Sequence, residues 1–213
     1  MDFLSTCIRG IALEEVADGK LNKEIEHEFY GRIIDFSVLE RATGHVEEQE
    51  QWELKIPKTN ENMARGSIRI RRTSVINGKG IDQYVMTTKT YPDNSDTALE
   101  LPIPTTRENF LQFQALSSRG MLKHRYPFKV EGTDLVFEVD MFLKPGSKTR
   151  DKDYFEWCKI DLEVTDRSAK IPPLPFELAD MIPPKALGPH TQQQSDQIKQ
   201  LYETMFIRPN IFL

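Results

Sequence analysis

Charged side chains recur at every second position in several segments of this sequence, with acids in some segments and bases in others. The acids are Glu24, Glu26 and Glu28, then Glu138 and Asp140, then Asp161 and Glu163. The bases are Arg69 and Arg71, then Lys89, then Lys123 and Arg125, and Lys159. Residues two apart lie on the same face of a β-strand, so each group would point in one direction. Carboxylates suit Mg²⁺ or Mn²⁺ and basic side chains suit phosphate, which together describe a metal–phosphate site.

The intervening positions of the same segments are apolar, as in Ile68 and Ile70 or in Ile160 and Leu162. An antiparallel sheet with one face in water explains this alternation in any single strand. Across the chain, however, the acids gather on the first and last segments and the bases on the middle ones. This distribution favours a closed barrel with a charged interior and an apolar exterior that helices cover. Charges removed from water are costly unless partners replace the water, so we expect cations and anions to fill the interior.

The elements that would position these residues follow from the spacing of apolar side chains. The period-two segments predict β-strands at about 23–30, 52–56, 68–72, 84–90, 99–103, 122–128, 135–142 and 157–164. Apolar residues at helical spacing predict helices over about 3–18, 106–119, 176–182 and 192–206. The acidic, glutamine-rich stretch 47–51 is interpreted as an exposed loop or a short helix. We therefore expect an α+β fold with a mostly antiparallel sheet.

The size of the chain suits one domain with additions. Its 213 residues, 38% of them hydrophobic, can bury one core. We expect an N-terminal helical extension at 1–21 and the tunnel-like β-domain at 22–168. Prolines become frequent after residue 169, which predicts that 169–213 is a proline-rich segment and a C-terminal helix that packs on the domain.

Charge and cysteine content exclude several classes of function. The net charge of −5 argues against DNA binding by the whole surface, but it leaves room for a local basic channel. Cys7 and Cys158 lie far apart and form neither a disulfide framework nor a zinc-site spacing. No window reaches the length of a membrane span and no leader is visible, so we expect a cytoplasmic protein without a membrane partner.

In their order along the chain, the charged motifs resemble those of the CYTH or triphosphate tunnel metalloenzyme family. Members open with an E-x-E-x-K strand, followed by R-x-R, a strand ending in Lys, K-x-R, E-x-D and a closing acidic pair. The corresponding segments here are Glu24-Ile25-Glu26, Arg69-Ile70-Arg71, Thr87-Thr88-Lys89, Lys123-His124-Arg125, Glu138-Val139-Asp140 and Asp161-Leu162-Glu163. Each motif alone is weak, and it is the shared order over roughly residues 22–165 that carries the resemblance.

The resemblance implies an eight-stranded antiparallel tunnel that binds a triphosphate and hydrolyses it with Mg²⁺ or Mn²⁺. The implied metal-binding and catalytic residues are Glu24, Glu26, Glu138, Asp140, Asp161 and Glu163. The implied phosphate-binding residues are Arg69, Arg71, Lys89, Lys123, Arg125 and Lys159. Family members act on inorganic triphosphate, nucleoside or thiamine triphosphate, or RNA 5′ ends, so the implied partner is a triphosphate-containing small molecule or an RNA 5′ end.

One departure from the family stands at Glu28, where the opening motif has a lysine. Glu28 could pair with Arg69 or Arg71, or it could alter the metal site and weaken substrate binding. A non-catalytic tunnel that binds a nucleotide or polyphosphate, and an adenylate cyclase of class IV type, are the alternatives to a hydrolase. His27 and His124 fall on the outward face of their strands, so we expect them to pack or hydrogen-bond away from the site.

Overall fold

The structure of the chain is a computed structural model that describes residues 22–55, 65–76, 81–91, 98–147, 152–164 and 169–206. The helical extension expected at 1–21, which contains Cys7, lies outside the described residues. So does the end of the chain after residue 206.

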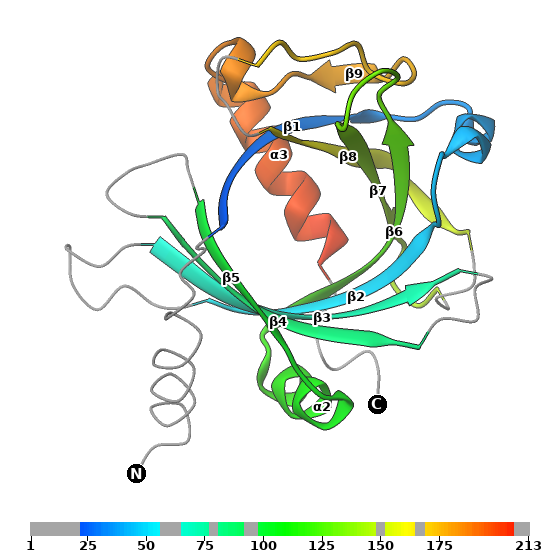
Figure 1. Cartoon of the computed structure of the whole chain (residues 1–213). Helices are drawn as coiled ribbons and strands as arrows, with labels where there is room; N and C mark the ends of the chain where they lie inside the picture. Colours follow the sequence, from blue (N-terminus) through cyan, green and yellow to red (C-terminus); the bar gives the residue numbers. More distant parts are fainter. Residues whose placement is uncertain are drawn as a thin grey trace.

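Nine antiparallel strands form one sheet, accompanied by few helices, so the fold is α+β (Figure 1). The strands are β1 (Asn22–Arg32), β2 (Glu47–Lys55), β3 (Arg65–Val75), β4 (Gln83–Tyr91), β5 (Ala98–Pro104), β6 (Arg119–Lys129), β7 (Val136–Leu143), β8 (Tyr154–Val164) and β9 (Ala179–Ile182). Neighbours follow the order β5-β4-β3-β2-β6-β7-β8-β1-β9. The expected strands are confirmed, and most of them extend further than the alternation indicated.

Strand β1 pairs with three other strands, one of which lies at the opposite end of the strand order. It pairs with β8 along most of its length and with the short strand β9 on its other side. Its first residues, Asn22–Glu24, also pair with Ala98–Glu100 of β5, at the opposite end of the order. The sheet is therefore strongly curved, as Figure 1 shows.

The apolar face of the strands forms the main core, as the alternation predicts. Its buried side chains include Phe29, Phe137, Val139, Ile160 and Leu162. The 3-10 helix η2 (Phe36–Arg41) and the proline-rich segment 169–178 pack on this face. Burial of these side chains supplies the main free energy that holds β1, β7 and β8 together.

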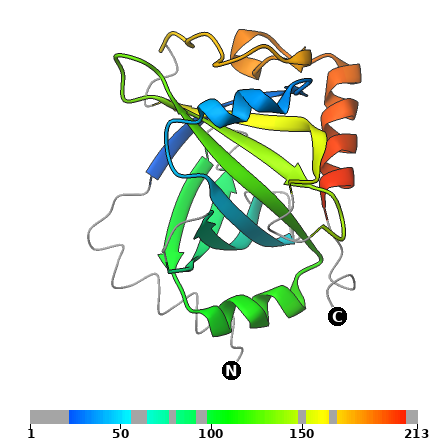
Figure 2. The ribbon, with the colours of Figure 1, turned by 90° about the vertical axis from the view of Figure 1, so that its right-hand side faces the viewer.

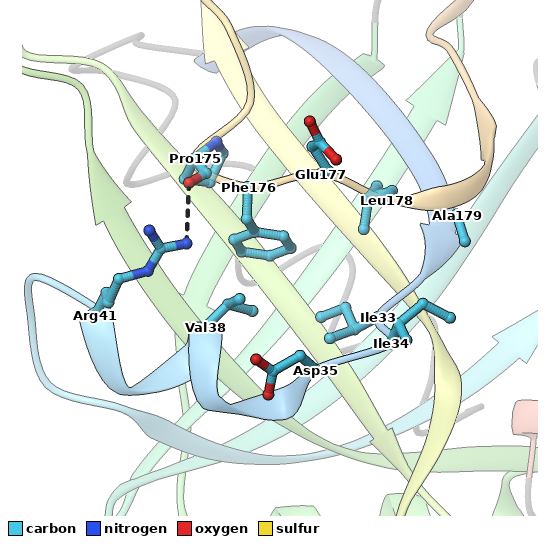
Figure 3. Close-up of a pocket in the computed structure, with 10 residues that line it drawn as sticks. All are labelled: Ile33, Ile34, Asp35, Val38, Arg41, Pro175, Phe176, Glu177, Leu178 and Ala179. Atoms are coloured by element: carbon cyan, nitrogen blue, oxygen red, sulfur yellow. Dashed lines mark hydrogen bonds between the residues drawn. The ribbon is translucent and has the colours of Figure 1, made fainter.

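A hollow of about 470 Å³ lies between η2 and the proline-rich segment, on the apolar side of the sheet (Figure 3). Beside it, Arg41 donates a hydrogen bond to the carbonyl oxygen of Pro175 at 3.3 Å. Phe176 packs edge-on against Phe128. These contacts fasten the proline-rich segment to the core, and the charged side chains of the strands lie on the other face.

Helix α2 (Arg107–Leu116) begins at the N-cap Thr106, whose side chain accepts a hydrogen bond from the Asn109 backbone. Its Phe110 packs with Trp52 and Ile70 on the apolar face of β2 and β3, and Figure 2 shows the helix below the strands. This position confirms the expectation of a helix over the apolar face. Among the described residues, no helix has the length and apolar content needed to cross a membrane.

Helix α3 (Gln192–Met205) packs on the charged face, which the sequence analysis did not expect of any helix. Its Met205 clusters with Met121 and Phe142, and the hydroxyl of Tyr202 lies 3.0 Å from that of Tyr30. Met121 and Phe142 continue the faces that carry the charges, because they lie two residues from Lys123 and Asp140. The charged face becomes apolar at one end, and α3 covers that end.

Two expectations are wrong. Residues 47–51 belong to β2 and form neither a loop nor a short helix, because Glu48 pairs with Arg72 at 2.7 Å and Gln49 is buried. The helix expected at 176–182 is replaced by β9, which pairs with β1. Asp180 has a left-handed backbone with φ 51°, and Arg32 holds its carboxylate at 2.6 Å. The conformation of both segments therefore depends on partners that are distant in sequence.

We predict that Ile160→Ala lowers the free energy of unfolding by about 2–5 kcal/mol, because Ile160 is fully buried and its removal leaves a cavity. Ile81→Ala is the matched control, since Ile81 is 90% exposed, and it should change stability by less than about 0.5 kcal/mol. Urea unfolding measures both. Equal effects of the two substitutions would mean that the apolar face is not the core.

Candidate functional site

The charged face of the sheet brings most of the predicted residues together. Its members are Glu26, Glu28, Arg69, Arg71, Lys89, Lys123, Arg125, Glu138, Asp140, Lys159, Asp161 and Glu163. The strand register places Glu26 opposite Glu163, and Asp161 between Glu28 and Glu138. Glu24 lies on β1, but its side chain is outside the described part of the chain. The expected pairs therefore become one cross-strand array.

Asp140 is the centre of a buried ion-pair cluster. Both of its oxygens accept hydrogen bonds from Arg125, at 2.7 and 2.8 Å, and Lys123 contacts it closely. Burial by itself would raise the pKa of Asp140, but Arg125 and Lys123 outweigh it and hold the pKa well below its usual range. Burial and the neighbouring Arg125 lower the pKa of Lys123 to about 8. Asp140 thus holds two bases in place.

Arg125 contacts two acids besides Asp140. It also contacts Glu138 closely, and it lies 3.6 Å from Asp161. Burial would lower the pKa of Arg125, yet its acidic neighbours, Asp140 first, raise that pKa well above the usual value. Arg125 therefore stays charged and links the basic strands to the acidic ones.

Lys159 is surrounded by acids of β1 and β8. Its ammonium lies 2.7 Å from Glu28 and 2.9 Å from Asp161. The hydroxyl of Tyr30 donates a hydrogen bond to the second oxygen of Glu28 at 3.3 Å. Glu28 therefore faces the site and pairs with Lys159, and the expected pairing with Arg69 or Arg71 is not the one found.

A possible metal position lies among Glu26, Glu28 and Asp161, which can each offer one oxygen within 4.8 Å of the others. Burial raises the pKa of Asp161 to about 6; Lys159 opposes the shift, and Glu26 and Asp140 add to it. Burial and the neighbouring Glu138 and Glu26 also raise the pKa of Glu163. Hard oxygen ligands that repel one another fit a divalent cation such as Mg²⁺ or Mn²⁺.

Glu100 belongs to the charged face, although the sequence reasoning missed it. It is 5% exposed, and it forms ion pairs with Lys89 at 2.6 Å and Arg69 at 2.9 Å. Lys89 also lies 3.5 Å from Glu26. The alternation Leu99-Glu100-Leu101 indicated that Glu100 lies on the polar face of a strand. A single acid in a short strand, however, gave no reason to select Glu100 as a site residue.

Arg71 differs from the other bases of the charged face. It forms no ion pair with any carboxylate among the residues that the structure describes. Burial lowers its pKa, and the positive charges of Arg125 and Arg69 lower it further. An arginine crowded by two others, with no carboxylate beside it, is suited to bind an anion.

Two histidines and one further ion pair lie outside this array. His27 and His124 are buried on the apolar face, and the Nδ1 atom of His124 lies 2.5 Å from the hydroxyl of Tyr154. Arg119 and Glu53 pair at the end that α3 covers, where Arg119 also lies over the ring of Phe206 at 4.0 Å. The histidines therefore pack away from the charged face, as their strand positions predict.

Comparisons with known proteins add little to this geometry. No protein-family model and no curated protein matches the chain. Among solved structures, the PH1819 protein from Pyrococcus horikoshii OT3 is similar with a TM-score of 0.46 and 16% identity, covering 86% of this chain and 94% of that one. The hypothetical protein NE1496 gives a TM-score of 0.37 and 21% identity, with 70% of this chain and 83% of that one covered. Likenesses of this size carry no argument about function.

We predict that Asp161 makes the metal-free protein less stable as the pH rises. Its folded pKa of about 6 lies above the value of about 3.9 for an unfolded chain. The folded state therefore binds the proton more tightly, and the contribution to stability is fully present below about pH 4 and lost as the pH passes 6.

The measurement compares wild type with Asp161→Asn, which imitates the protonated form, by urea unfolding in a chelator. The free energy of unfolding of wild type minus that of the variant should fall by on the order of 2 kcal/mol between pH 4 and 7. A difference that is constant or rises with pH would contradict the assignment.

Proposed function

We propose that this chain is a divalent-metal-dependent phosphohydrolase that binds a triphosphate on its charged face. In this proposal the eight longer strands form a closed tunnel, and the charged face lines its interior. The pairing of Asn22–Glu24 with β5 supports closure, because it joins the two ends of the eight-strand order. The position of α3 supports an enclosed interior, because the helix packs on the charged face.

The observation that carries the proposal is the guanidinium of Arg71, which pairs with no carboxylate among the residues that the structure describes. Its charge is crowded by Arg69 and Arg125, while the carboxylates of Glu138 and Glu47 act on it only from a distance. Glu163 likewise has no ion pair within the described part of the chain, and nearby acids raise its pKa. A triphosphate with its divalent cation brings the two charges that these side chains lack.

In this proposal the bases bind phosphate and the acids bind the cation. Arg71 and Arg125 would contact phosphate oxygens and stabilise charge that develops on the transferred phosphoryl group. Glu26 and Glu163 would hold the cation, which neutralises phosphate charge and makes a bound water more acidic. A carboxylate of the charged face that does not hold the cation would accept the proton of the attacking water.

The charges of this face favour a phosphate chain and leave the rest of the substrate open. Inorganic triphosphate, a nucleoside triphosphate and an RNA 5′-triphosphate all present the same group to Arg71. None of the side-chain contacts described favours cyclisation over hydrolysis. Binding without turnover is therefore an outcome of the experiment that follows.

We predict that the purified protein releases phosphate from at least one of tripolyphosphate, ATP and 5′-triphosphorylated RNA in Mg²⁺ or Mn²⁺. Arg71→Gln should lower kcat/KM by about 10- to 100-fold, the size expected for one hydrogen bond to a charged group. Glu163→Gln should lower kcat more than it changes KM. Phosphate release measures all three proteins.

The control is Arg72→Gln, because Arg72 is the next residue of β3 and pairs with Glu48 on the opposite face. It should keep kcat/KM within about twofold at temperatures where it remains folded, since its loss is one of stability only. Absence of phosphate release from every substrate would sink the hydrolase proposal. Calorimetry with tripolyphosphate would then decide between binding without turnover and no binding.

A further inference from the structure

Lys159 sits where a cation would be expected. It lies on β8 opposite Tyr30 and Asp140, and its ammonium is 2.7 Å from Glu28 and 2.9 Å from Asp161. Two of the three acids that could hold a metal ion are therefore already bound to a positive charge. The side chain of Lys159 is 13% exposed, so water does little to separate these charges.

Both oxygens of Glu28 are engaged. One pairs with Lys159, and the other accepts the hydrogen bond from Tyr30. Tyr30 is in turn held by Tyr202 of α3, with 3.0 Å between the two hydroxyl oxygens. A metal ion at Glu28 would therefore lie beside the ammonium of Lys159, and the two positive charges would repel each other.

Asp161 also lies beside positive charges, although neither of its oxygens accepts a hydrogen bond from a described residue. One oxygen lies beside Lys159 and the other lies 3.6 Å from Arg125. Lys159 and Arg125 thus place two fixed positive charges beside these acids. Lys159 therefore occupies the place between Glu28 and Asp161 that an added cation would otherwise take.

The other end of the acidic strands is different. Glu26 and Glu163 face each other directly across β1 and β8. Among the described residues, Glu26 has one ion-pair contact, the long one of 3.5 Å with Lys89, and Glu163 has none. Two facing carboxylates repel each other unless a cation lies between them.

We infer that Lys159 permanently fills one of two cation positions on the charged face, so that a single divalent ion binds with the triphosphate, at Glu26 and Glu163. The inference rests on the proposed function and adds to it the number and place of the metal ions. Lys159 is then a positioning residue, because it fixes the acids that surround the metal and does not contact the reacting atoms.

The test counts metal ions by equilibrium dialysis of Mn²⁺ with imidotriphosphate, a triphosphate analogue that resists hydrolysis. Wild type saturated with the analogue should hold one Mn²⁺ per chain in the complex. Lys159→Gln should bind two, because Glu28 and Asp161 lose their positive partner. Lys144→Gln is the matched control, since Lys144 pairs with Asp153 on the surface, and it should bind one.

Circular dichroism checks that each variant is folded, and Lys159→Met provides a second way to remove the charge. The wild-type count decides the question even if neither variant folds. Two Mn²⁺ ions in wild type, or one in a folded Lys159 variant, would overturn the inference and leave the proposed function standing. No Mn²⁺ and no analogue bound to wild type would overturn the proposed function, and the inference with it.

Discussion

The structure depends on one constraint: acids and bases that are removed from water must neutralise each other. Asp140 is almost fully buried and remains ionised only because Arg125 and Lys123 surround it. Removing one member of such a cluster leaves an uncompensated buried charge, which costs several kcal/mol. The charged face is therefore fixed in geometry without a ligand, and this rigidity suits the proposed triphosphate site.

The same constraint explains the position of α3. The charged face ends in Met121, Phe142 and Trp157, which have no charges to balance and need apolar partners. Met205 of α3 supplies one, and Tyr202 adds a hydroxyl that reaches the polar part through Tyr30. One helix thus covers the apolar end of the face and also supports the acids next to it. Helix α3 therefore contributes both to the stability of the fold and to the position of Glu28 in the candidate site.

The two faces of the sheet differ in how their residues are held. On the apolar face, side chains such as Phe137 and Ile160 are held by packing beneath η2 and the proline-rich segment. On the charged face they are held by directional ion pairs between strands, from Arg125 to Asp140 and from Lys159 to Glu28. Packing tolerates small changes of shape, whereas ion pairs require both partners, so substitutions on the charged face have the more specific effects.

The sequence by itself determined the strands, their apolar and charged faces, and the residues that the faces carry. Alternation is a local property, so Glu138, Asp140 and Asp161 were selected correctly as neighbours on one face. Segments 47–51 and 176–182 were predicted wrongly because their conformations depend on partners such as Arg72 and Arg32, which are distant in sequence.

Only the tertiary structure decided which charges meet. It paired Glu28 with Lys159, added Glu100 beside Lys89, left Arg71 without a carboxylate among the described residues, and placed α3 on the charged face. The order of strands in the sheet fixes these distances, and it brings together segments more than a hundred residues apart. The sequence thus named the charged residues of the candidate site, and the fold decided which of them form ion pairs with one another.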